Sequence, residues 1–248
     1  MFIMGSGYIN CNILKKTYSA FKSIVDDSLT EVTADMLNGA TSISSYAFFS
    51  CDNLTSVEIP SSVTSIGAYA FEYCRNLTSI TIPSSVTWIA GESFSNCSAL
   101  TSIEIPNSVT SINYRTFSSC SALASVTIPS SVTSIQGSVF NYCTSLASIT
   151  IPNSVKSIGD RAFQSCTSLT SIVIPSNVTW IGSSVFNSCS VLTSVTIEAK
   201  TPPTAGANLF NNTHANLVIY VPAESVEAYK SANNWSTYAS RIQAIPSI

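Results

Sequence analysis

The apolar positions of this chain recur in a fixed order every 23 residues. A representative unit covers residues 66–88. Its first half has apolar side chains at most three or four positions apart, namely Ala70, Phe71, Cys74 and Leu77. This spacing predicts a short helix with one apolar face.

A short strand is expected after the helix in each unit. Ile80 and Ile82 alternate with polar Ser79 and Thr81, which is the period of a half-buried strand. Pro83 ends this strand because proline cannot donate a hydrogen bond to a sheet. Each unit therefore predicts one helix and one strand.

The register of the pattern is unbroken over seven units. Each unit carries a phenylalanine with a cysteine three residues later, at Phe48, Phe71, Phe94, Phe117, Phe140, Phe163 and Phe186 and at Cys51, Cys74, Cys97, Cys120, Cys143, Cys166 and Cys189. A period of 20 to 50 residues is typical of a solenoid, in which each coil buries its apolar face against its neighbours. We predict a right-handed α/β solenoid with a parallel concave sheet, short helices on the convex side and capped ends.

The chain divides into three expected regions. Residues 1–40 predict an N-terminal cap helix and a degenerate repeat, and residues 41–197 hold the seven repeats. Residues 198–248 predict a final irregular repeat and a C-terminal cap. Caps are expected because the two ends of a stack would otherwise expose apolar cross-sections.

The repeat pattern also carries a resemblance. The order Ile-x₃-Ala-Phe-x₂-Cys-x₂-Leu-x₂-Ile-x-Ile-Pro, as at residues 66–83, resembles the BspA-like leucine-rich repeat family of bacterial and protist surface proteins. The tail with Tyr220, Pro222 and Trp235 is similar to the C-terminal cap of that family. The resemblance implies a leucine-rich repeat solenoid with adhesion-type recognition of a protein or glycan, at the cell surface or in secreted form.

Composition narrows the classes of partner. Charged residues make up only 9% of the chain, against about 25% in average proteins. The net charge is −3 without a basic run, so we expect no nucleic acid partner. No apolar run approaches the roughly 18 residues that a membrane span requires, so we expect no membrane-spanning segment. Because residues 1–8 lack the features of a secretory signal, a cytoplasmic location is the alternative.

Residues suited to catalysis are few. The single histidine, His214, has no surrounding motif that indicates a catalytic triad. Glu58 and Glu104 lie on strands two coils apart, roughly 9.6 Å, near the carboxylate separation of inverting glycosidases. An open sheet does not provide the burial that raises the pKa of a general acid. We therefore predict a protein that is not an enzyme, with no catalytic residue and no cofactor.

The repeat cysteines suggest either a metal site or disulfides at first sight. Zinc sites use close pairs such as Cys-x₂-Cys, whereas these cysteines are always 23 residues apart. Parallel side chains in one column rarely reach the torsion of a disulfide bond. We expect no metal, and eight thiols including Cys11, with the repeat cysteines packed as small hydrophobes.

Two sets of exposed positions are candidates for partner binding. One set is the polar columns of the strands, with Glu58, Ser79, Thr81, Ser102, Glu104, Ser125, Thr127, Ser148 and Thr150. The other set is Trp88 and Trp180, which occupy a position that is serine in most units. Solenoids commonly bind along such surfaces, and tryptophan is enriched at binding hot spots.

Other interpretations of the same surfaces stay open. The chain could be an intracellular or phage-borne interaction scaffold, or its hydroxyl lattice could bind carbohydrate or ice. The polar columns could also be an idle face that keeps the sheet soluble. We expect a monomer that binds a protein or glycan as a rigid, preorganised surface.

Overall fold

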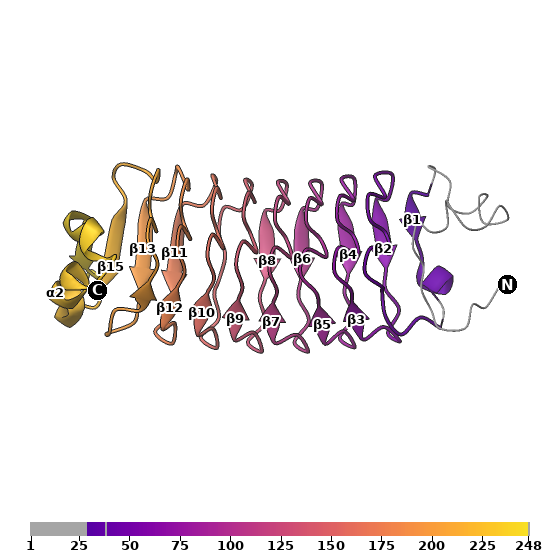
Figure 1. Cartoon of the computed structure of the whole chain (residues 1–248), viewed down its shortest axis with the longest axis horizontal. Helices are drawn as coiled ribbons and strands as arrows, with labels where there is room; N and C mark the ends of the chain where they lie inside the picture. The colour runs from indigo at the N-terminus through magenta and orange to yellow at the C-terminus, as the bar shows by residue number, and fades with distance from the viewer. Residues whose placement is uncertain (1–28, 38, 248) are drawn as a thin grey trace.

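The computed structural model describes residues 29–37 and 39–247, and the N-terminal cap helix expected upstream lies outside them. The coils form one elongated stack, with the C-terminal end closed by α2 (Figure 1). Strands one coil apart pair in parallel with a 23-residue offset, as Ser56 does with Ser79. The predicted solenoid is confirmed, with about nine turns.

Two sets of strands alternate along the chain. The first set is β1 (Glu31–Val32), β2 (Ser56–Glu58), β4 (Ser79–Thr81), β6 (Ser102–Glu104), β8 (Ser125–Thr127), β11 (Ser171–Ile174), β13 (Ser194–Ile197), β15 (Val218–Val221) and β16 (Ile242–Ala244). The second set is β3 (Ser65–Ile66), β5 (Trp88–Ile89), β7 (Ser111–Ile112), β9 (Ser134–Ile135), β10 (Ser157–Ile158), β12 (Trp180–Ile181) and β14 (Thr204–Ala205). We call the outward side chains of these sets the front face and the second face.

Helical segments are confined to the two ends of the described chain. They are η2 (Ala34–Leu37), η3 (Ala223–Ser225), α2 (Val226–Ser231) and η4 (Ser236–Arg241). Within residues 41–197 the helices expected on the convex side are replaced by consecutive turns. That part of the prediction is wrong.

The backbone of the turn segments explains the difference. Tyr69 and Tyr73 have φ angles of 59° and 62°, which a right-handed helix does not contain. The amide of Phe71 donates to the carbonyl of Ser93 in the next coil at 2.8 Å, instead of to a residue four positions earlier. A spacing of three or four apolar residues therefore fits this chain of turns as well as it fits a helix.

The turn segments also remove the reason to expect a concave sheet. We expected helices to widen one side of the stack and so to curve it. The turns instead link neighbouring coils by hydrogen bonds, such as that from Phe94 N to Thr116 O at 3.0 Å. The wider helical layer is missing from the described repeats, and the stack runs straight across Figure 1.

A continuous column of phenylalanine rings fills the interior. Neighbouring rings from Phe48 to Phe210 are nearly parallel, with centroids 5.1 to 5.8 Å apart. At the C-terminal end, Phe210 contacts Tyr238 and Trp235. The buried indole of Trp235 donates to Pro203 O at 2.8 Å, so the polar atom of this cap residue is satisfied.

Candidate binding surface

The front face carries two columns of exposed polar side chains. Parallel pairing places Ser102 beside Ser125 and Glu104 beside Thr127. The nine candidates from the strand pattern are all exposed, at Glu58, Ser79, Thr81, Ser102, Glu104, Ser125, Thr127, Ser148 and Thr150. Residues 148–150 take the equivalent place without forming a regular strand. The structure thus brings the predicted front-face residues together in adjacent coils.

Some of the hydroxyls that flank the front face are hydrogen-bonded to the protein, whereas among the described residues the hydroxyls on the front face are not. Thr78 Oγ1 donates to Thr55 O at 3.0 Å, and Thr193 Oγ1 donates to Thr170 O at 3.2 Å, so these flanking hydroxyls tie coils together. Within residues 29–37 and 39–247, the hydroxyls of Ser125 and Thr127 make no hydrogen bond to the protein. They are therefore available to a ligand.

The candidate catalytic groups are not assembled into a site. Glu58 and Glu104 are both exposed, in coils separated by the coil of Thr81. His214 Nδ1 accepts a hydrogen bond from Asn216 N at 3.1 Å, a local contact within its loop. No group of three or more metal-ligating side chains occurs in the described part of the chain.

The second face presents the two tryptophans. Trp88 is 53% exposed and Trp180 is 41% exposed. Trp88 pairs with Ser65, and Trp180 lies between Ser157 and Thr204 in the ladder. The two indoles are four coils apart, roughly 19 Å, so they belong to separate patches.

A ladder of polar and aromatic contacts, which sequence reasoning missed, follows the turn side. The rings of Tyr46 and Tyr69 stack at 4.7 Å, and Tyr69 donates to Glu92 Oε1 at 3.1 Å. Glu92 also lies 3.8 Å from the guanidinium of Arg115. The hydrogen bond to Glu92 raises the pKa of Tyr69. The sequence signal for this ladder is the 23-residue separation of consecutive members.

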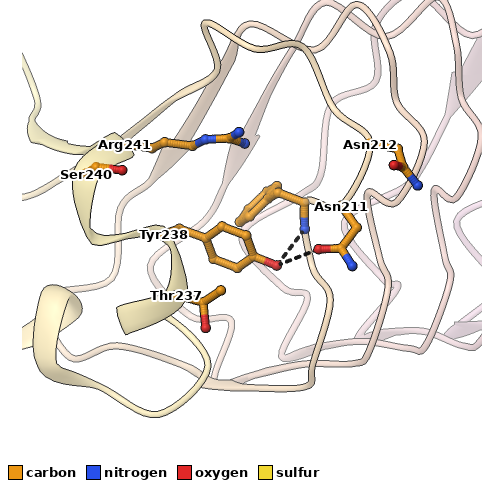
Figure 2. Close-up of a pocket in the computed structure, with 7 residues that line it drawn as sticks. Asn211, Asn212, Thr237, Tyr238, Ser240 and Arg241 are labelled. Atoms are coloured by element: carbon orange, nitrogen blue, oxygen red, sulfur yellow. Dashed lines mark hydrogen bonds between the residues drawn. The ribbon is translucent and has the colours of Figure 1, made fainter.

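Among the hollows on the surface of the described residues, two have several polar side chains in their lining. One hollow, of about 460 Å³, lies where the last coil meets the C-terminal cap, and Figure 2 shows it. There the hydroxyl of Tyr238 accepts from Phe210 N at 3.2 Å and lies 3.5 Å from Asn211 Oδ1. Arg241 donates to Thr213 Oγ1 at 3.2 Å. These contacts hold the cap on the last coil.

The other hollow, of about 430 Å³, is on the second face beside Trp180. Ser134 and Ser157 form part of its lining, and Tyr114 lies on the opposite side from Trp180 along the stack. Trp180 was a candidate from the sequence, whereas Tyr114 was not among the candidates. Trp88 does not line this hollow.

The buried cysteines are structural donors. Six of them, Cys74, Cys97, Cys120, Cys143, Cys166 and Cys189, are free and buried, as expected. Each thiol donates to the carbonyl of the phenylalanine 26 residues earlier, at 3.0 to 3.2 Å. Burial raises the pKa of Cys120 to about 12.

Cys51 is different, and the expectation of eight thiols is wrong for it. It takes part in a disulfide bond. Cys51 is only half-buried at the start of the column, whereas the six later cysteines are enclosed between coils. Cys11, which was also expected to be a thiol, lies outside the described residues.

One further feature concerns membranes. Among the helices of residues 29–37 and 39–247, none has the length and apolar character needed to cross a bilayer.

Comparison with known proteins identifies the repeat. The family model for the BspA type leucine rich repeat region matches residues 17–147 and 110–237, in six copies. No curated protein matches the chain significantly.

Solved structures give the same result. A leucine-rich repeat protein from T. pallidum is 32% identical, with a TM-score of 0.62, over 68% of this chain and 79% of that one. A leucine-rich cell surface protein from Faecalibacterium prausnitzii is 30% identical, with a TM-score of 0.62, over 89% of this chain and 65% of that one. The present chain thus spans just under two thirds of the Faecalibacterium chain. By its repeat motif and its coil geometry, this chain belongs to the BspA-type leucine-rich repeat family.

Proposed function

We propose that this protein is a non-catalytic binding protein that recognises a protein or glycan at the cell surface through the front and second faces of the stack. The front-face observation carries the proposal, because it combines exposure, fixed register and hydroxyls without an internal partner. A rigid surface loses little conformational freedom when it binds. Repeat proteins of this family are generally not enzymes, and the exposed, separated carboxylates of the front face agree with a binding role.

The surface location rests on the relatives. The Faecalibacterium protein is described as a cell surface protein. Protease treatment of intact producing cells tests this location, since it removes a surface protein and spares an internal scaffold.

The lattice interpretation has less support. Glu58, Glu104 and Val173 are exposed on the front face and interrupt the columns of hydroxyls. A surface that recognises a repeating lattice needs an uninterrupted array of matching groups. A partner with its own varied surface fits these interruptions better.

The test of front-face binding is the double variant Ser125→Lys and Thr127→Lys. Two long cationic side chains in adjacent columns block close approach to the hydroxyls, and we expect binding of the labelled protein to host and bacterial cells to fall about tenfold or more. Flow cytometry measures this binding. Both residues point to solvent, so the free energy of unfolding is expected to change by less than about 0.5 kcal/mol.

A matched control uses another side of the same coils. Thr110→Lys and Thr133→Lys add the same charge in a column where lysine already occurs, at Lys156. These lysines stand beside the second face and leave the front face clear, so this control is expected to bind cells more strongly than the front-face variant does. If the front-face variant bound cells as strongly as the unchanged protein does, the proposal that this face binds a partner would be contradicted.

A further inference from the structure

The hollow beside Trp180 has an exposed aromatic side chain at each end along the stack. Trp180 is 41% exposed and Tyr114 is 44% exposed. They belong to coils three steps apart, roughly 14 Å by strand spacing. Tyr114 leans toward Trp180, because a Cβ added to Gly137 in the next coil would lie 3.4 Å from its ring. The two aromatic side chains at the ends of the hollow therefore lie closer together than the two coils that carry them.

Small residues between the aromatic side chains create the floor of the hollow. Ser134 and Ser157 hold the position that Trp180 holds in its own coil. Ser157 Oγ donates to Ser134 Oγ at 3.1 Å, which fixes the two hydroxyls relative to each other. Gly159 cannot carry a side chain, because a Cβ there would lie 2.4 Å from Gly137 N. The floor is thus low, polar and rigid.

Amide and carboxylate groups of the lining are held by neighbouring coils. Gln136 Nε2 donates to Asn113 Oδ1 at 2.9 Å, and Asn113 is buried. Asp160 Oδ1 accepts from Ser183 N at 2.6 Å. Each group keeps one further polar atom for a ligand. A volume of about 430 Å³ falls in the range of roughly 300–1,000 Å³ typical of small-ligand sites.

Unpaired positive charge accompanies these groups. Arg161 lines the hollow and is exposed, and within the described residues its guanidinium makes no salt bridge or hydrogen bond. Lys156, directly before Ser157, is likewise exposed and without an ion pair in that part of the chain. By contrast, Arg75 pairs with Asp52 at 3.0 Å. The hollow therefore suits a ligand that brings a carboxylate of its own.

We propose that this hollow binds an acidic oligosaccharide, with sugar rings against Trp180 and Tyr114, sugar hydroxyls on Ser134 and Ser157, and a sugar carboxylate on Arg161. The electron-rich face of an indole or phenol attracts the polarised C–H groups of a pyranose ring. A guanidinium forms two parallel hydrogen bonds with a carboxylate. This inference rests on the proposed binding function and names one site and one ligand class for it.

An extended peptide fits the hollow less well. Peptides often bind by adding a strand to a free sheet edge. Here the backbone is already paired from coil to coil, since Gln136 N donates to Ile112 O at 2.9 Å and Gly159 N donates to Ile135 O at 2.8 Å. Only side-chain contacts remain, and hydroxyl, amide, aromatic and guanidinium groups together match a saccharide.

The experiment titrates the whole protein with an oligogalacturonide tetramer, sialyllactose and a hyaluronan tetrasaccharide, by calorimetry. We expect at least one of these carboxylated probes to bind. Its neutral counterpart, the methyl-esterified tetramer, lactose or carboxyl-reduced hyaluronan, is expected to bind about tenfold or more weakly. Indole fluorescence should change on binding, because Trp180 is an exposed tryptophan in contact with the sugar.

Variants assign the site. Trp180→Ser and Arg161→Ser restore residues found elsewhere in the same columns, such as Ser157 and Ser138, so we expect both variants to fold. Each is expected to weaken binding of the acidic probe about tenfold or more. Arg161→Ser should also abolish the preference over the neutral counterpart.

The controls change the same residue types elsewhere. Trp88→Ser removes the other tryptophan of the column, four coils away, and Arg75→Ser removes an arginine that is already paired. Both controls are expected to bind the probe with unchanged affinity.

Three results would overturn the inference. These are no binding of any of the three acidic probes, equal loss in the Trp88→Ser control, and tighter binding of a tetraglutamate peptide than of every sugar. None of these results would contradict the proposed function, which is tested separately by cell binding of the front-face variant. If that variant lost cell binding while none of the sugar probes bound the protein, the proposed binding function would stand and the proposed saccharide site would be rejected.

Discussion

Residues at equivalent positions of successive coils make the same hydrogen bond, each to the same type of residue in the preceding coil. A cysteine donates its S–H to a phenylalanine carbonyl of the preceding coil, and a threonine beside the front face donates to a threonine carbonyl. Each of these hydrogen bonds is weak alone. Because the same donor recurs in successive coils, however, one backbone carbonyl after another along the column gains a hydrogen-bond partner. The identity of a residue is therefore explained by its column rather than by its sequence neighbours.

The buried thiols should be inert in the folded protein. Burial raises the pKa of Cys74, Cys120 and Cys189 to about 12, so almost no thiolate exists at neutral pH. We expect the six described free cysteines to resist iodoacetamide in the native state and to react after denaturation, as measured by mass spectrometry. Rapid alkylation of the native protein at neutral pH would contradict the burial.

The same pKa shifts set a dependence of stability on pH. The folded state holds the thiol protons more tightly than the unfolded state, in which the pKa is about 9. The stabilisation is therefore complete below pH about 9 and decreases as the pH rises toward about 12. Urea unfolding across this window should show a falling midpoint, and Cys120→Val should lessen the fall.

At the scale of elements, the turn segment distinguishes this stack from one with a helical side. Two positions per coil adopt positive φ, and asparagine, serine, tyrosine, arginine and glutamate all occur there. Left-handed conformations cost an L-residue roughly 1–2 kcal/mol, and asparagine tolerates them best. The coil-to-coil hydrogen bonds of the segment offset this cost.

Substitutions at Ser119, whose φ is 61°, test this account. Ser119→Asn is expected to increase the free energy of unfolding by about 0.5 kcal/mol, and Ser119→Val to decrease it by about 1 kcal/mol. Urea denaturation measures both values. If valine were tolerated as well as asparagine, the positive φ would not be the constraint at this position.

The apolar periodicity predicted the strands of the front face well, missed the strands of the second face and predicted helices wrongly, for a physical reason. Ser79 to Thr81 alternates in polarity, and only an extended segment places alternate side chains on opposite faces. Residues 70–77 bury Phe71, Cys74 and Leu77 in either a helix or a chain of turns. The choice depends on whether backbone amides pair within the segment or with the next coil, which the spacing of apolar residues does not encode.

At the scale of the whole molecule, the C-terminal cap closes the phenylalanine column. Trp235 is buried, with ring centroids 6.4 Å from Phe210 and 5.3 Å from Tyr229. Tyr229 donates to Ala199 O at 2.7 Å, so the cap reaches back across the last coils. Because each coil contacts only its neighbours, the cap protects the end of the stack first.

Trp235→Ala should therefore destabilise the end of the molecule more than its middle. We expect a loss of about 3–5 kcal/mol from the cavity and the lost ring contacts. Hydrogen exchange should speed up first in the coils nearest residue 210 and later in those around residue 117. Trp180→Ser, which removes an exposed indole, is the control and should change stability by less than about 0.5 kcal/mol.

The candidate site was partly visible in the sequence. The front-face columns and the exposure of Trp88 and Trp180 follow from strand alternation and from breaks in the repeat. The hollow beside Trp180 was not foreseen, because it depends on the lean of Tyr114 over Gly137 and on Arg161 lacking an ion pair among the described residues. Those features arise between coils, where residues 23 or more positions apart meet.

The sequence by itself determined the stack, its register and its buried columns, because an unbroken period forces equivalent residues of successive coils into contact. It also determined which strand residues face solvent, since side chains alternate along a strand. Only the tertiary structure decided between helix and turn in the segments that join successive front-face and second-face strands. It alone decided which of the exposed side chains lie together, because hydrogen bonds and side-chain contacts between coils depend on the packed backbone.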